Sequence, residues 1–255
     1  MTPSWETSLV PAGEVRLCVR RQTAAGKPLV LLHGLGAGGA VWQAFGRRLS
    51  PPWQCVAPDM RGHGESDKPA SGYEPQDYAR DIAALIGSLG AGPVPVVGHS
   101  LGALVALALA AFHAGTVSRV VLLDPPVDAS IDNPDVGEVY RLRRAPPGEL
   151  ERYLGVPALA PIFRQAADGV FEWYLNSERG AEWAWEAAPS IGAPVLVVQA
   201  DPAKGGVVGD IAAAEFVQRL PHGARVKIDG APHALHASHG ADVARLVLEF
   251  LGRAA

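Results

Sequence analysis

The sequence has few cysteines and no leader-like start. Only Cys18 and Cys55 occur among its 255 residues, and both lie in strand-like runs where a buried free thiol is expected. We therefore expect no disulfide framework, which fits a reducing compartment. The first residues, MTPSWETSLVPAGEVRL, lack a basic start followed by an apolar core. We therefore expect no secretory signal, and we expect a cytoplasmic location.

Blocks of basic charge and long apolar runs are also missing. The formal net charge is −4, and lysine and arginine form no cluster, so nucleic acid is not an expected partner. The longest apolar run, around residues 101–112, is too short to span a bilayer and predicts a buried helix. We therefore expect no membrane partner. No feature of the sequence indicates an oligomeric state.

Strand-like and helix-like segments alternate along much of the chain. Strands are expected at about 14–20, 28–33, 53–58, 93–98 and 118–124, and later in APVLVVQA and ARVKI. Several of these runs are almost continuously apolar, as expected for strands whose sheet is covered by helices on both faces. The pattern predicts an α/β fold with a mostly parallel, doubly wound sheet.

The alternation stops between about residues 127 and 190, where the sequence is rich in proline and aromatic residues and contains no clear strand. We predict one core made of residues 1–126 and 191–255, interrupted by an insertion at 127–190. Within the insertion, YRLRRAPPGELER mixes basic and acidic residues and predicts a solvated helix face.

Residues 34–39, GLGAGG, have the glycine spacing of a dinucleotide-binding fingerprint. They follow a strand, and Asp59 ends the next strand, where an acid could bind a ribose. An NAD(P)-binding oxidoreductase is therefore one interpretation. It is weakened because the chain has 29 glycines, which makes chance matches common, and because His33 rather than an apolar residue precedes the motif.

Residues 98–102, GHSLG, place a serine between two glycines where a strand gives way to a helix. A serine nucleophile needs a base to accept its proton and donors to hold the oxyanion that forms. A sharp turn would raise Ser100 above the sheet edge, and crowding around that turn favours Gly98 and Gly102. The helix begins near Leu101 and directs its free amides at the site, so the Leu101 amide is a predicted oxyanion donor.

Five segments together resemble the α/β-hydrolase fold superfamily over nearly the whole chain. In chain order they are LVLLHGLGAGGAVW, VAPDMRGHGES, VVGHSLGAL, VVLLDPP and IDGAPHALHASH. The resemblance implies an α/β-hydrolase fold in which residues 127–190 form a helical cap over the serine. It also implies that the loop after His33 supplies a second oxyanion amide, from Leu35. It is much less specific for the substrate.

The resemblance implies that the base is His233, which follows a glycine by three positions. His236 and His239 follow at intervals of three, a spacing that would also suit a metal site. No carboxylate joins them in a recognisable motif, and the stretch lies where the base of a hydrolase belongs. We therefore expect neither a metal nor an organic cofactor. The remaining candidates, His33, His63 and His99, are expected to be structural.

The acid that orients the base has two candidates. The family usually places it after the penultimate strand, but Ala203 occupies that position and Asp201 stands two residues earlier. Another known place follows the strand that leads into the insertion, where VVLLDPP offers Asp124. We favour Asp124 and keep Asp201 as the alternative.

The resemblance implies a serine hydrolase that cleaves small or medium, mostly apolar carboxylic esters or lactones through an acyl-enzyme. Halide displacement and most epoxide opening in this family use an aspartate at the elbow, and Ser100 argues against both. Carbon–carbon bond hydrolysis, perhydrolysis and a hydrolase-like receptor remain alternatives, because all of them are compatible with an intact serine and histidine.

Overall fold

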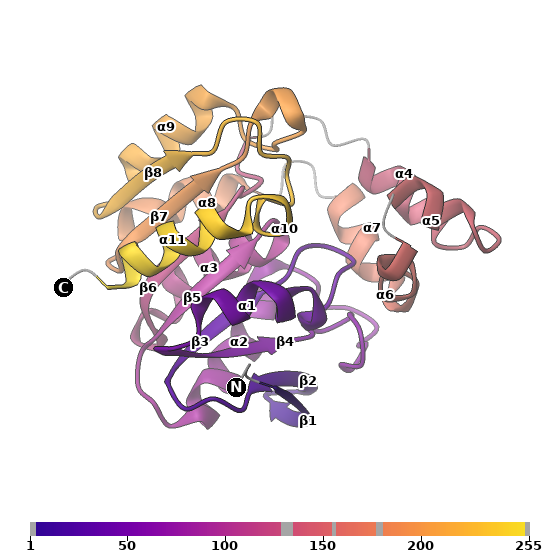
Figure 1. Ribbon diagram of the computed structural model, residues 1–255, viewed down its shortest axis with the longest axis horizontal. Coiled ribbons are helices and arrows are strands. Elements are labelled where there is room, and N and C mark those ends of the chain that lie inside the picture. Colours follow the sequence, from indigo (N-terminus) through magenta and orange to yellow (C-terminus); the bar gives the residue numbers. More distant parts are fainter. Residues whose placement is uncertain (1–3, 129–134, 155–156, 177–180, 253–255) are drawn as a thin grey trace.

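The computed structural model describes residues 4–128, 135–154, 157–176 and 181–252. Eight strands form one sheet in the order β1-β2-β4-β3-β5-β6-β7-β8 (Figure 1). The strands are β1 (Trp5–Ala12), β2 (Val15–Gln22), β3 (Lys27–Leu32), β4 (Trp53–Pro58), β5 (Val94–His99), β6 (Val117–Leu123), β7 (Val195–Gln199) and β8 (Gly223–Lys227). The strands from β4 to β8 along the sheet pair in parallel, whereas β1 and β2 join antiparallel at one edge. The predicted α/β-hydrolase fold, with its mostly parallel sheet, is confirmed.

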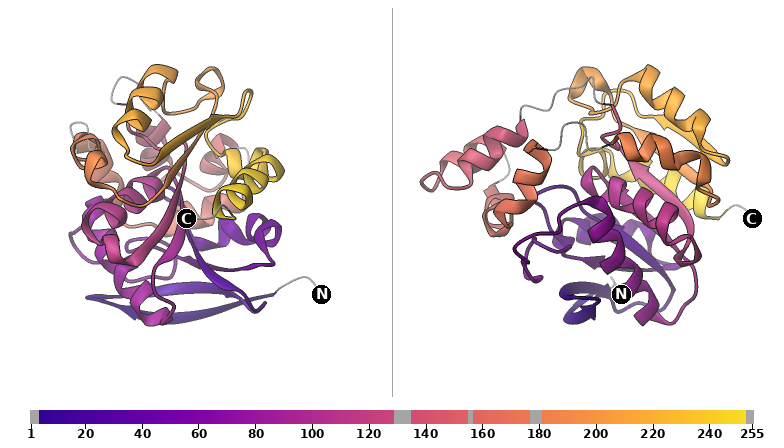
Figure 2. Two further views of the ribbon diagram at one scale, coloured as in Figure 1. Left: turned by 90° about the vertical axis from the view of Figure 1, so that its left-hand side faces the viewer. Right: turned by 180° about the vertical axis from the view of Figure 1, so that it is seen from behind.

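Helices cover both faces of the sheet, as the edge-on view in Figure 2 shows. They are α1 (Gln43–Leu49), α2 (Pro75–Leu89), α3 (Leu101–Phe112), α8 (Glu182–Ala187), α9 (Asp210–Arg219), α10 (Leu235–Ser238) and α11 (Gly240–Leu251). Within β3, Val30 and Leu32 face one core with α2 and α3, whereas Leu29 and Leu31 face the other with α1 and α11. Because both faces are buried, the strand reads as a continuous apolar run.

Strand β1 is an element that the sequence pattern did not predict. Its side chains are mostly exposed, and Leu9 is 55% exposed, so the segment lacks the apolar alternation of a half-buried strand. Backbone pairing with β2 holds it along its whole length, and Trp5 and Ala12 at its two ends pack against the core. Both cysteines are free and buried, and burial raises the pKa of Cys18 to about 11 and that of Cys55 to about 12.

The chain between β6 and β7 contains helices α4 (Asp135–Leu142), α5 (Glu149–Leu154), α6 (Ala160–Gln165) and α7 (Asp168–Asn176), followed by α8. Figure 1 shows α4 to α7 gathered beside the sheet, and the right-hand view in Figure 2 shows the same arrangement from behind. Helix α8 instead packs against α3. Among the described helices, none is long and apolar enough to cross a membrane.

The turn between β5 and α3 brings three backbones into close contact. A Cβ atom at Gly98 would lie 2.1 Å from the carbonyl oxygen of Gly102, and one at Gly102 would lie 2.3 Å from that of Leu32 in β3. Real Cβ atoms do not approach backbone oxygens this closely, and neither neighbour is a flexible side chain that could give way. The two glycines of GHSLG are therefore required by packing, as the sequence pattern predicted.

We expect Gly102→Ala to destabilise the fold although alanine is the better helix former. Overpacking costs typically ~1–3 kcal/mol, and the rigid backbone oxygen should place this variant at the upper end or beyond. Gly87→Ala in α2 is the matched control, because nothing lies within 4 Å of a Cβ there. It should gain roughly 0.5–1 kcal/mol from helix propensity. Urea unfolding measures both, and equal changes in the two variants would contradict the packing argument.

Candidate active site

The candidate site lies at the carboxyl ends of β3, β5 and β6. From β3 the chain proceeds to β4 on one side, while β5 pairs with the other side of β3. Connections that diverge in this way leave a crevice beyond the strand ends, where ligands bind in open α/β sheets. The parallel register pairs His99 with Leu123, and the Ser100 amide donates to the Leu123 carbonyl at 3.1 Å. Ser100 and Asp124 are therefore held side by side on adjacent strands.

Ser100 and Asp124 share an unusual backbone conformation. Their φ angles are 54° and 46°, and among the described residues they are the non-glycine residues with positive φ. Such a conformation costs on the order of 1–3 kcal/mol for each residue and persists only where surrounding contacts enforce it. Strain of this kind concentrates at functional sites, because it aims a side chain in a direction that regular structure does not allow.

Asp124 makes the hydrogen bond to His233. Its carboxylate is fully buried, and Oδ2 accepts a hydrogen bond from His233 Nδ1 at 2.7 Å. The amides of Ala200 and Val207 donate to the two carboxylate oxygens at 3.1 and 2.9 Å. These donors compensate for the loss of solvent around the charge. Because Nδ1 donates to Asp124, the neutral imidazole keeps its proton there and leaves Nε2 free to accept one.

Asp201 has a different set of partners. Its Oδ1 accepts from the Ala203 amide at 3.0 Å, and its Oδ2 accepts from the Gly230 amide at 2.9 Å. These backbone bonds, that of Gly230 foremost, lower the pKa of the carboxyl. Asp201 thus ties the turn after β7 to the loop after β8. Of the two predicted acids, Asp124 is the one that contacts His233.

The loop after β3 carries the predicted oxyanion donor Leu35 and is held by two buried histidines. His63 Nε2 accepts from the Gly36 amide at 3.1 Å, and His33 Nε2 accepts from the Met60 amide at 3.0 Å. Burial lowers the pKa of both rings, so they remain neutral acceptors at these atoms. Their contacts are those of structural residues.

The Leu101 amide, first in α3, has no intrahelical acceptor.

The glycines of GLGAGG make room for neighbouring side chains. A Cβ at Gly36 would lie 2.6 Å from Phe163 and 2.9 Å from Phe171, both from the segment between β6 and β7. Asp59, the residue that a dinucleotide site would place on a ribose, is buried and bonded instead. It accepts from Arg20 at 2.6 Å and from the Gly39 amide at 2.7 Å. The packing role of these glycines could not be predicted from the sequence, because the rings that they accommodate come from a segment distant in the chain.

His233, His236 and His239 do not converge. The His236 ring packs on Trp42 with a centroid distance of 4.5 Å, and burial lowers its pKa to about 3. His239 Nδ1 lies 3.0 Å from the Ser238 hydroxyl. In the part of the chain that the structure describes, no group of three or more His, Cys, Asp or Glu residues has the arrangement of a metal site.

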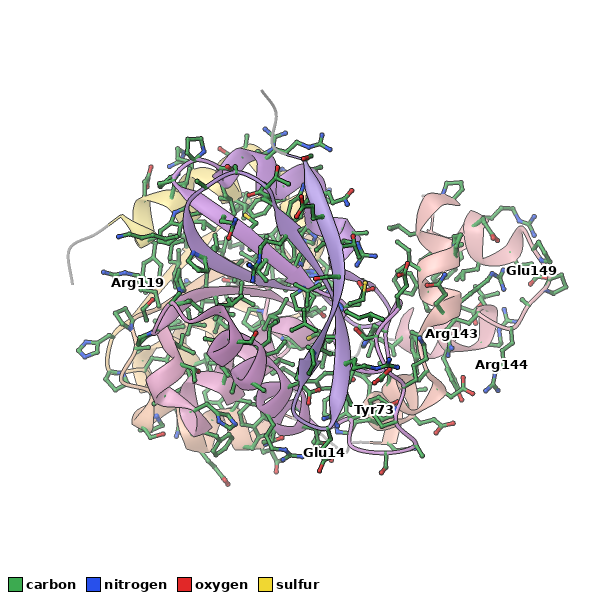
Figure 3. The ribbon with its side chains drawn as sticks, turned by 90° about the horizontal axis from the view of Figure 1, so that it is seen from below. Glu14, Tyr73, Arg119, Arg143, Arg144 and Glu149 are labelled. Carbon is green, nitrogen blue, oxygen red and sulfur yellow. The ribbon has the colours of Figure 1, made fainter. Side chains whose placement is uncertain are left out.

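Arg143 corrects the expectation that YRLRRAPPGELER forms a solvated face. Its side chain is buried, donates to the carbonyls of Phe163 and Ala166, and lies 4.5 Å above the Phe171 ring. Arg144, the next residue, is exposed and pairs with Asp168. Figure 3 shows both arginines within the group of α4 to α7. Sequence reasoning missed Arg143 because its partners, two carbonyls, the Asp168 carboxylate and an aromatic ring, all come from later parts of the chain.

The chain belongs to the α/β hydrolase fold family, which residues 27–168 match. A curated relative, 2-(acetamidomethylene)succinate hydrolase of Mesorhizobium japonicum, is 43% identical over 115 residues, covering 45% of this chain and 41% of that protein. Lipase LipV of Mycobacterium tuberculosis is 38% identical over 138 residues, covering 54% of this chain and 51% of the lipase. The chain thus spans about half the length, or less, of these relatives.

Among solved structures, that of E-2-(acetamidomethylene)succinate hydrolase superimposes with a TM-score of 0.80 at 27% identity, covering 98% of this chain and 100% of that chain. The likeness extends beyond residues 27–168, which the family matches, to nearly the whole chain. Together these comparisons make the chain a member of a hydrolase family.

We expect the bond between Asp124 and His233 to be visible in solution. A short hydrogen bond to a buried carboxylate shifts a proton far downfield and slows its exchange with water. The His233 Nδ1 proton should therefore give a far-downfield resonance in proton NMR. Asp124→Asn should abolish this resonance and Asp201→Asn should leave it in place. Its loss in Asp201→Asn alone would mean that the two acids are exchanged.

Proposed function

We propose that the protein is a serine hydrolase that cleaves small or medium carboxylic esters or lactones through an acyl-enzyme. The observation that carries this proposal is the juxtaposition of a strained Ser100 on one strand end with a strained, buried Asp124 on the next, the latter bonded to His233 at 2.7 Å. An acid, an imidazole and a hydroxyl in this order are the groups that acyl transfer requires.

The proposed reaction starts when Ser100 attacks a carbonyl carbon and His233 Nε2 accepts the hydroxyl proton. The amides of Leu35 and Leu101 hold the oxyanion, aided by the positive end of α3. His233 then protonates the leaving group and afterwards activates a water that releases the acyl group. Within the described residues the Ser100 hydroxyl makes no hydrogen bond to His233, and such contacts tighten when substrate binds. The sequence requires no metal or organic cofactor for these steps.

We further propose that residues 127–190 form a cap that shapes the substrate pocket. Phe163 and Phe171 lie against Gly36, next to the proposed oxyanion donor Leu35. The Ala167 amide donates to the Gly62 carbonyl at 2.7 Å and joins the same segment to the core. The partly buried Phe163 ring beside the proposed oxyanion loop favours an apolar acyl group, and the similarity to a lipase supports an ester substrate.

A second candidate substrate comes from the comparisons. A curated relative at 43% identity over part of its length is named for hydrolysis of 2-(acetamidomethylene)succinate, and so is a solved structure that is similar over 98% of this chain. The same serine chemistry acts on acyl groups attached to nitrogen, so this compound belongs in the substrate panel beside aryl esters and lactones. A ratio of kcat/KM values among them separates the two candidates.

Ser100→Ala should abolish hydrolysis while the protein stays folded. Loss of the nucleophile is expected to reduce the rate by on the order of 10⁴-fold or more. An organophosphonate should label Ser100 stoichiometrically, located by mass spectrometry, and EDTA should leave the activity unchanged. Activity within tenfold of the parent, or inhibition by EDTA that zinc reverses, would contradict the proposal.

Asp124→Asn should reduce kcat by on the order of 10³- to 10⁴-fold, because the amide holds the imidazole in the wrong tautomer. Asp201→Asn is the matched control, since it changes an equivalent strand-end acid that binds only backbone amides. It should alter kcat far less, and a thermal melt reports any loosening of its loop. A larger fall in kcat for Asp201→Asn than for Asp124→Asn would show that Asp124 is not the catalytic acid.

A further inference from the structure

His99 precedes Ser100 in the chain and is in contact with His233. It is the last residue of β5, only 8% exposed, and its Nε2 lies 3.0 Å from the backbone carbonyl oxygen of His233. The two imidazole rings also pack together, with centroids 4.6 Å apart. The residue before the proposed nucleophile thus touches both the backbone and the ring of the proposed base.

The chemistry of this contact defines the state of the His99 ring. A carbonyl oxygen only accepts hydrogen bonds, so Nε2 must carry the proton and donate it. Burial lowers the pKa of His99 well below its usual value, with the neighbouring His236 and His233 acting in the same direction. The ring is therefore neutral. It supports His233 without placing a second positive charge beside an imidazole that becomes positive during the proposed reaction.

Two further neighbours keep the His99 ring in place. On one side, a Cβ at Gly34 would lie 3.0 Å from His99 Nδ1 and 3.3 Å from Ser100 Cβ, so the loop that carries Leu35 lies against the ring. On the other side is the His236 ring, with a centroid distance of 4.5 Å. His99 accordingly meets the oxyanion loop and the base, and is bonded through the backbone to the nucleophile.

We propose that His99 is a positioning residue, whose Nε2–H bond to the His233 carbonyl fixes the backbone of the base beside the elbow that carries Ser100. This inference rests on the proposed function of Ser100 and His233. Space filling would be served by any ring of similar size, such as phenylalanine. The donor on Nε2 is what distinguishes a positioning role, because it ties the loop after β8 directly to the elbow.

Three substitutions at His99 distinguish the effect of the aromatic ring from the effect of the hydrogen-bond donor on Nε2. His99→Phe keeps a ring without a donor, His99→Gln keeps a donor amide that reaches the same carbonyl, and His99→Met has the length of glutamine with no donor. His236→Phe is the control, since its ring belongs to the same stack and its Nδ1 has no hydrogen-bond partner. Rates are measured below the melting temperature of each variant and divided by active sites titrated with the phosphonate.

We expect kcat to fall by about 10- to 100-fold in His99→Phe and His99→Met, because a misplacement near 1 Å costs up to that much. KM should stay within about threefold, since substrate binding is not the step affected. His99→Gln should recover kcat to within about fivefold of the parent, and His236→Phe should stay close to it.

Values of kcat within threefold of the parent in both donor-free variants would overturn the inference, as would equal losses in His99→Gln and His99→Met. The glutamine and methionine pair decides the matter if His99→Phe does not fold. Hydrolysis by Ser100→Ala at the rate of the parent would instead overturn the proposed function. Failure of the His99 inference and failure of the proposed function are therefore distinguishable.

Discussion

The approach of three backbones at the elbow is the constraint on which the rest of the site depends. A methyl group at Gly102 would meet the carbonyl of Leu32 at 2.3 Å, so α3 can pack this tightly on β3 only without a side chain there. This contact places the first turn of α3 above the sheet edge and forces the positive φ of Ser100. The close packing at the glycines thus sets the turn that directs the Ser100 hydroxyl away from the sheet. The free backbone amides at the start of α3 lie beside it.

Around the elbow, polar groups that have left water are satisfied by one another. Asp124 accepts hydrogen bonds from two backbone amides and from the His233 imidazole, and His63 accepts one from the Gly36 amide. Each of these bonds joins segments that are distant in sequence, and each would leave a buried polar group unpaired if broken. Shape and hydrogen bonding therefore maintain the same arrangement, which is the condition for a preorganised site.

Local patterns in the sequence predicted the fold and the sharp turn at Ser100, whereas contacts between distant segments could not be predicted from such patterns. The glycines around Ser100 and the apolar strands are readable because packing constrains neighbouring residues. Choosing between Asp124 and Asp201 requires the path of the loops after β7 and β8, which no short pattern encodes. Arg143 resembles its charged neighbours until later parts of the chain supply its carbonyl partners. Strand β1 pairs through its backbone while most of its side chains stay exposed.

The partners of Asp124 also determine when the site can form during folding. Its bonds to Ala200, Val207 and His233 span 76, 83 and 109 residues. Closing loops of such length carries an entropic cost that is offset only when the later strands have joined the sheet. On the ribosome, the segment that carries Ser100 emerges first and holds an incomplete site. The carboxylate acquires its three donors only after His233 has left the exit tunnel, so the site cannot be completed before that residue has emerged.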